Sequence, residues 1–188
     1  GKYSGKHSQR WIQFPKTPRK VPFFIDHLHY INWIEDNIKN GEMHNIRHFW
    51  SSIRPNGPTR PYELNRLELR VCDFVADIDL LLAITAFLEL RILALFENVD
   101  TLDPLRSSKF SLDELQEICD ENEIRAAKES LNAELIHWKN GEVIICKDWI
   151  RNLLEENYVF AKKFNMLEIL KPIQRVLEEG NKSMQWIS

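Results

Sequence analysis

Cysteine is scarce in this sequence of 188 residues. The three cysteines, Cys72, Cys119 and Cys146, lie far apart, and their number is odd. This spacing provides neither a CxxC metal pair nor a disulfide framework. The pattern fits a reducing compartment, so we expect a cytoplasmic protein. The polar start of the sequence also lacks the apolar segment of a signal peptide.

Glycine is almost as scarce. The six glycines are scattered and form no glycine-rich phosphate-binding loop. Zinc is not expected either. A zinc site needs ligands at helical spacing together with a third ligand, and this combination is not found among His27, His29, His44, His48 and His137.

The chain has no overall excess of positive charge. Its net charge of −3 argues against a general nucleic-acid binder, which is normally basic. Residues 1–25 nevertheless hold six basic groups and no acid, which leaves 19 basic against 28 acidic residues in the remainder. This basic leader could contact nucleic acid or phosphate. A solvated loop around Pro15, Pro18 and Pro22 is the favoured interpretation.

No long hydrophobic run is free of charge. Ile78–Asn98 is the most apolar stretch, but Asp79, Thr85, Glu89 and Arg91 interrupt it. A membrane-spanning helix needs about 20 mainly apolar residues with few charges. We therefore expect no membrane span. The stretch predicts a helix that Asp77 caps and that neighbouring elements cover on most sides.

The remaining periodicity predicts an α+β chain rich in helix. Apolar spacing, capping residues and turn signals predict helices at about 24–40, in a short stretch after the capping box Ser111–Glu114, and at 122–135, 148–164 and 166–179. Strands are predicted at 48–54 and 62–72, and a hairpin at 136–146 has a type I′ turn at Asn140-Gly141. The first two strands would leave unpaired edges, so we expect part of their sheet to lie outside this chain.

The most informative local feature is one face of the strand at 62–72. Arg66, Glu68 and Arg70 follow one another at two-residue spacing beside a stiff, proline-rich loop. Glu68 could hold a divalent cation, and Arg70 could pair with phosphate in a bidentate way. The alternative is a solvent-facing strand with ordinary cross-strand charge pairs, and the pattern alone favours it.

Four stretches together resemble a known family. They are Ser4–Trp11 with Pro15, the run His48-Phe-Trp-Ser-Ser-Ile-Arg-Pro55, the run Asn65-Arg-Leu-Glu-Leu-Arg-Val-Cys-Asp73, and Glu121–Ala133. Their order and motifs resemble the glutamate–cysteine ligase and carboxylate–amine ligase family, most closely its cyanobacterial-type branch. The last stretch departs from the family pattern at Glu123, Ile124 and Lys128.

The resemblance implies a glutamine-synthetase-like fold that uses ATP and Mg²⁺. In the family, ATP phosphorylates the γ-carboxylate of glutamate, and the amino group of cysteine attacks the acyl phosphate. The product is γ-glutamylcysteine, for glutathione synthesis. The resemblance implies that Glu68 binds the metal, that Arg70 contacts phosphate, and that Arg54 binds a substrate carboxylate or phosphate. Further binding candidates are Arg66, Arg10, Arg125 and Lys128, of which the last two could equally be exposed helix charges.

The family's amino-terminal half has no counterpart in these residues. We therefore interpret residues 1–188 as the carboxyl-terminal part of one catalytic domain. Residues 1–75 would carry the leading loop, a helix and the active-site strands, and residues 76–188 a helical part with a hairpin. We expect this chain alone to be inactive and able to form a homo-oligomer. Two alternatives stay open: a ligase for another amine, and a non-catalytic, helix-rich binding module.

Overall fold

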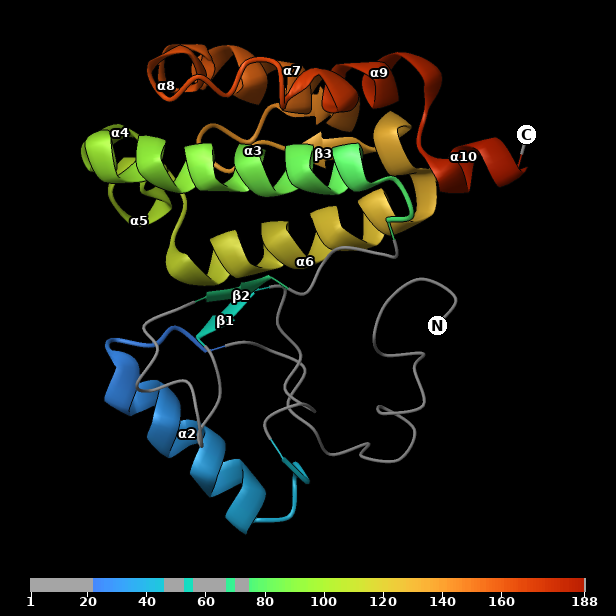
Figure 1. Cartoon of the computed structure of the whole chain (residues 1–188). Coiled ribbons are helices and arrows are strands. Elements are labelled where there is room, and N and C mark those ends of the chain that lie inside the picture. The colour runs from blue at the N-terminus through green and yellow to red at the C-terminus, as the bar shows by residue number, and fades with distance from the viewer. Residues whose placement is uncertain (1–21, 46–52, 56–66, 70–74, 188) are drawn as a thin grey trace. The chain divides into compact units, whose positions relative to one another are not determined.

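The computed structural model describes residues 22–45, 53–55, 67–69 and 75–187. The chain divides into two compact units, Gly1–Phe74 and Val75–Ser188. The described residues are mostly helical and contain two small antiparallel sheets of two strands each (Figure 1). The predicted helix-rich α+β chain is confirmed.

The first unit holds one described helix and one strand pair. Helix α2 (His27–Lys39) begins after Asp26, whose Oδ1 accepts a hydrogen bond from the His29 N–H at 2.7 Å. The predicted helix is confirmed, and Asp26 is its N-cap. Strands β1 (Ile53–Pro55) and β2 (Leu67–Leu69) lie within or at the end of the predicted strands, whose other residues are outside the described ranges.

Helix α3 (Ile78–Glu97) is the longest helix of the second unit. As predicted, Asp77 caps it, because its side chain accepts from the N–H groups of Asp79 and Leu80. The Leu80 hydrogen bond lowers the pKa of the Asp77 carboxyl, and the Arg175 guanidinium, 2.7 Å from Asp77 Oδ2, also lowers it. This ion pair joins the start of α3 to helix α9 (Lys171–Glu179).

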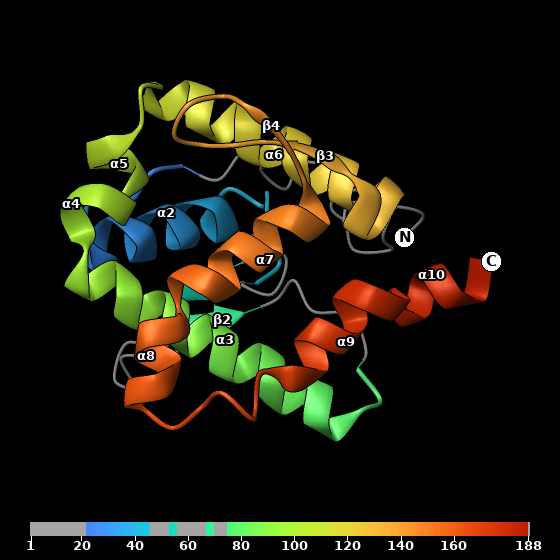
Figure 2. The ribbon, with the colours of Figure 1, turned by 90° about the horizontal axis from the view of Figure 1, so that it is seen from above.

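The prediction that α3 is covered on most sides is wrong. One face is buried through Ala83, Ala86, Leu90 and Ala94, and within the described part of the second unit the opposite face carries exposed apolar residues such as Leu81 and Ile92. The reason is that α3 packs against helices α8 (Tyr158–Lys163) and α9, which lie along the same side of it (Figures 1 and 2). None of the helices in the described ranges is long and apolar enough to span a membrane.

Helix α6 (Leu112–Glu129) is one continuous helix where two were predicted. Its capping box is confirmed: the Ser111 N–H donates to Glu114 Oε2 at 2.7 Å, and the Ser111 side chain accepts from the Glu114 N–H. The predicted break near Asn122 is wrong because no glycine or proline interrupts the residues that follow. Two short helices, α4 (Val99–Leu102) and α5 (Pro104–Ser107), precede α6, and a 3₁₀ turn at Ser130–Asn132 follows it.

The predicted hairpin is present as β3 (Glu134–Ile136) and β4 (Val143–Ile145). Its turn is not type I′, because Gly141 has φ +76° and Asn140 has no positive φ. The longer connection closes through the Gly141 N–H, which donates to the His137 carbonyl at 2.8 Å. The Asn122 side chain fastens β3 to α6, since it donates to the Ile136 carbonyl and accepts from the Ile136 N–H.

The last part of the chain is divided more finely than predicted. The helix expected at 148–164 is two helices, α7 (Cys146–Glu156) and α8, which Asn157 separates. The helix expected from Met166 begins only at Lys171, because Pro172 lacks an N–H and is suited to a first turn. It ends at Glu179 as predicted, with Gly180 as its C-cap, and α10 (Lys182–Ile187) follows. The hydrophobic core of the second unit includes Leu90, Leu131, Ala161, Leu170, Ile173 and Leu177.

Replacing Gly141 by alanine should destabilise the second unit. A Cβ at this position would lie 2.8 Å from Phe110 Cζ, and the positive φ adds about 1–2 kcal/mol of backbone strain for a residue with a side chain. Chemical denaturation should therefore show a lower free energy of unfolding for Gly141→Ala. In a Phe110→Leu background, which removes the Cζ atom, the loss should be smaller. Equal losses in both backgrounds would contradict the predicted clash.

His137 should make the stability of the second unit depend on pH. The half-buried ring stacks on Trp138 and contacts Trp149, and its Nδ1 accepts a hydrogen bond from the Lys139 N–H. Burial lowers the pKa of His137 in the folded state, although Glu156 and Glu142 oppose the shift. The folded chain therefore favours the neutral ring, and the free energy of unfolding should fall as the pH falls below about 6.5, the ordinary histidine value. Denaturation at pH 7 and pH 5 should show a smaller difference for His137→Gln than for the wild type.

Candidate functional site

The strand pair β1–β2 brings together two of the residues that the sequence singled out. The strands are antiparallel, and the register sets Arg54 directly opposite Glu68. Ile53 is opposite Leu69, and Pro55 is opposite Leu67. Residues directly opposite one another in an antiparallel pair share a face. Arg54 and Glu68 therefore occupy one face, and only apolar residues occupy the described positions of the other.

This pairing joins two motifs that are separate in the sequence. Arg54 belongs to the Ile-Arg-Pro run and Glu68 to the Glu-x-Arg run, with the proline-rich loop between them. Sequence reasoning proposed both residues but did not predict that they face each other. Arg10, Arg66 and Arg70 lie outside the described residues, as do Cys72 and most of the loop.

Arg125 and Lys128 belong to the second unit, on α6. The Arg125 guanidinium donates to the Glu134 carbonyl at 2.9 Å and pairs with Glu121 Oε1 at 2.6 Å. Arg125 thus links the helix to the first residue of β3. Lys128 is exposed in the last turn of the helix. The structure therefore gives Arg125 a structural contact, whereas Arg54 and Glu68 are paired on the first unit's strands.

No metal-binding cluster of three or more His, Cys, Asp or Glu residues occurs within the described part of the chain. A magnesium ion does not require such a cluster, because it keeps several waters and commonly binds through one or two carboxylates and substrate phosphates. The register sets Glu68 opposite Arg54, and a metal-binding role for Glu68 stays a prediction from the sequence.

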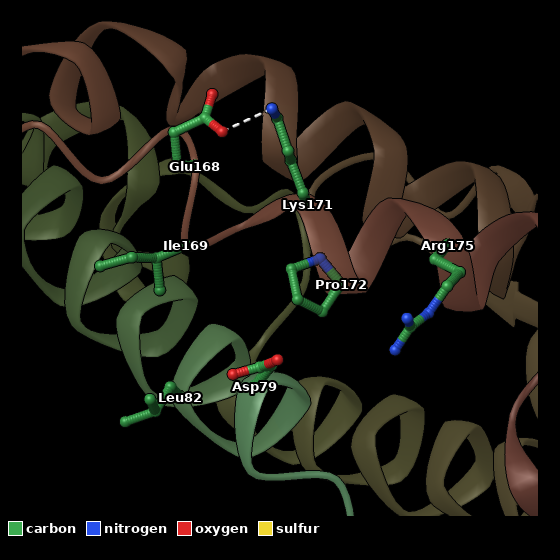
Figure 3. Close-up of a pocket in the computed structure, with 7 residues that line it drawn as sticks. All are labelled: Asp79, Leu82, Glu168, Ile169, Lys171, Pro172 and Arg175. Atoms are coloured by element: carbon green, nitrogen blue, oxygen red, sulfur yellow. Dashed lines mark hydrogen bonds and ion pairs between the residues drawn. The ribbon is translucent and has the colours of Figure 1, made fainter.

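A pocket of about 430 Å³ lies within the second unit, at the starts of α3 and α9. Figure 3 shows Asp79 and Leu82 on α3 across from Lys171, Pro172 and Arg175 on α9. Both cations are paired with acids, Lys171 with Glu168 and Arg175 with Asp77. Sequence reasoning missed this pocket, and no local signal could have found it, since Asp77 and Arg175 are 98 positions apart.

The described cysteines do not form a nucleophilic site. Cys146 begins α7 and packs against the core of the second unit. Burial raises the pKa of its thiol, which keeps it protonated and weakly reactive at neutral pH.

Comparison with known families agrees with the strand motifs. A family model described as glutamate–cysteine ligase family 2 matches residues 1–188. The chain belongs to this family. Family membership covers both units and includes the Arg54 and Glu68 strands.

One curated relative matches over nearly the whole chain. It is a Sorangium cellulosum (strain So ce56) protein named "Putative glutamate--cysteine ligase 2", 27% identical over 182 residues. The alignment covers 96% of this chain and 46% of the relative, so the chain spans about half the length of that protein. No solved structure matches the chain.

Proposed function

We propose that this chain carries part of the active site of an ATP-dependent glutamate–cysteine ligase. The proposed reaction joins the γ-carboxylate of glutamate to the amino group of cysteine through an acyl phosphate. Family membership supports a ligase, and the name of the Sorangium cellulosum relative supports this substrate pair. The observation that carries the proposal is the register that sets Arg54 opposite Glu68.

The two paired residues have the chemistry that this reaction needs. Phosphoryl transfer from ATP to a carboxylate brings several negative charges together, and it is accelerated mainly by positioning and by electrostatic stabilisation. Arg54 would bind a substrate carboxylate or phosphate, because a guanidinium pairs with either in a bidentate way. Glu68 would hold Mg²⁺, which neutralises phosphate charge when bound.

Further residues would complete the site around the strand pair. Following the family resemblance, we propose that Arg70 contacts the transferred phosphate and that Arg66 and Arg10 bind substrate or nucleotide. Lys128 stays a candidate of the same kind. For Arg125, any such role would have to coexist with its contacts to Glu121 and the Glu134 carbonyl.

The proposed enzyme needs more polypeptide than these 188 residues. The chain spans less than half of its relative, and β1 and β2 form a sheet of only two described strands. We propose that a glutamine-synthetase-like sheet is completed by an amino-terminal half of the same enzyme. We therefore expect the 188 residues alone to show little or no turnover. The separated cysteines fit a reducing cytoplasm as the site of the reaction.

Product identification tests the choice of amine. Full-length enzyme would be incubated with ATP, Mg²⁺ and glutamate, together with cysteine or one amine from a panel of amino acids and simple alkylamines. Mass spectrometry should detect the γ-glutamyl amide of cysteine as the main product. A main product with another amine would overturn the choice of cysteine but retain the ligase. If no amine yields an amide, the ligase proposal itself fails.

A further inference from the structure

The hydrogen-bond pattern of β1 and β2 follows from one residue, Pro55. In an antiparallel pair, opposite residues alternate between pairs that exchange two N–H···O bonds and pairs that exchange none. Pro55 stands opposite Leu67 and has no N–H, so these two residues cannot form a hydrogen-bonded pair. The neighbouring residues, Arg54 and Glu68, are therefore the hydrogen-bonded pair.

This alternation decides which backbone groups face the outer edges of the two strands. A residue of a hydrogen-bonded pair turns its N–H and C=O toward the partner strand, and its neighbours turn theirs away. The outer edge of β2 therefore offers the N–H and C=O of both Leu67 and Leu69, whereas the outer edge of β1 offers both groups at Ile53 but only a carbonyl at Pro55. Proline within a sheet is typical of an edge strand. The backbone thus suits β1 to the edge of a sheet and leaves β2 open to extension.

We propose that a strand from polypeptide outside these 188 residues pairs with the outer edge of β2 in the full-length protein. An unpaired strand edge is a template for another strand, because its N–H and C=O groups lie in a regular row. This inference rests on the proposed completion of the sheet and adds the position of the next strand. The strand order becomes β1, β2, then the added strand.

The added strand is assigned to further polypeptide because this chain offers no other candidate. Among the described residues, the other two strands, β3 and β4, pair with each other in the second unit. In residues 1–74, the sequence predicts strands only at 48–54 and 62–72, the two segments that give β1 and β2. The alignment covers less than half of the Sorangium cellulosum relative, which leaves ample length for further strands.

This strand order gives the two paired residues different surroundings. Glu68 lies on an inner strand, whose backbone is held by hydrogen bonds at both edges. Arg54 lies on an edge strand, whose backbone is held at one edge only. Sites are positioned most precisely on rigid elements, so the backbone that carries Glu68 is the better fixed of the two.

Amide hydrogen exchange of the full-length protein at single-residue resolution tests the extended edge. The N–H groups of Leu67 and Leu69 should exchange at least about 100-fold more slowly than the N–H of Ile53, because the added strand accepts them. The N–H groups of Arg54 and Glu68 are the internal control, since they bond within the pair and should be protected. Rapid exchange at Leu67 and Leu69 would overturn the proposal, as would protection of Ile53 in their place.

Proline substitution offers a matched pair of variants at opposite positions of the two strands. Leu69→Pro removes an outward N–H from β2, and Ile53→Pro removes one from β1. In the full-length protein, Leu69→Pro should lower the midpoint of thermal unfolding by more than Ile53→Pro does, because proline is tolerated at an edge but not between two strands. Equal losses would contradict the assigned strand order.

Photocrosslinking identifies the source of the added strand. A diazirine side chain introduced at position 69 of the full-length protein lies beside the next strand, because side chains at opposite positions of neighbouring strands are close together. Mass spectrometry should find crosslinks to a peptide from outside these 188 residues, in addition to the Ile53 region. Crosslinks confined to residues 1–188 would overturn the assignment to further polypeptide. Neither exchange, unfolding nor crosslinking depends on turnover, so failure of this inference is distinguishable from failure of the proposed ligase activity.

Discussion

Glu68→Gln should reduce turnover of the full-length ligase by on the order of 100-fold or more. Losing one electrostatic group at a reacting centre commonly has an effect of this size. The substitution keeps the size of the side chain but removes the negative charge that we propose for Mg²⁺ binding. Because Glu68 lies opposite Arg54, the change also leaves that arginine without a carboxylate at the facing position.

Two measurements separate loss of catalysis from loss of structure in this variant. The thermal unfolding of Glu68→Gln should resemble that of the wild type, and its apparent affinity for Mg²⁺ should be weaker. Glu117→Gln is the matched control, since it makes the same chemical change at an exposed position on α6 and should keep full activity. Unchanged turnover in Glu68→Gln would remove Glu68 from the mechanism.

Leu90→Ala should produce the largest loss of stability among the substitutions considered. Leu90 is fully buried on the inner face of α3, in the core that helices α8 and α9 share. Removing a buried leucine side chain typically costs about 2–5 kcal/mol, because apolar burial is lost and a cavity remains. The midpoint of thermal unfolding should fall by about 2–4 °C for each kcal/mol lost in a chain of this size.

Leu95→Ala provides a matched comparison on the same helix. Leu95 is 38% exposed, so its truncation should cost much less than that of the fully buried Leu90. Chemical denaturation of both variants would measure the difference directly. Equal losses would contradict the inner and outer faces assigned to α3.

Local signals predicted the ends of several helices because capping and turn chemistry depend on nearby residues. Asp77 caps α3, Ser111 and Glu114 form the capping box of α6, and Gly180 ends α9. The exposure of the outer face of α3 could not be predicted in the same way. An apolar sequence shows that a helix face favours burial, but it does not show which elements are present to cover it.

Segment length and turn type were harder to predict. The expected break in α6 rested on a second helix pattern near Asn122, whose side chain in fact holds the edge of β3. The Asn140-Gly141 pair favours a two-residue turn locally. In the structure, the turn is longer. The Ser108 hydroxyl donates a hydrogen bond to the Trp138 carbonyl, and the Lys109 N–H donates one to the Lys139 carbonyl. Tertiary contacts of this kind have no local signature.

The candidate site could be predicted in composition but not in pairing. The motifs identify Arg54 and Glu68 individually, since each lies in a recognisable short run. Which residue of β1 meets which residue of β2 depends on the path of the intervening loop, and its length and composition do not specify that path. A register shifted by one residue would have moved Arg54 to the apolar face of the pair.

ADP release by the full-length polypeptide is the most direct test of the ligase proposal. The enzyme would be supplied with ATP, Mg²⁺ and glutamate, and the rate would be measured with and without cysteine. We expect strong stimulation by cysteine, because amide formation consumes the acyl phosphate and lets turnover continue. A folded protein whose ADP release is unaffected by cysteine would contradict the assignment as a glutamate–cysteine ligase.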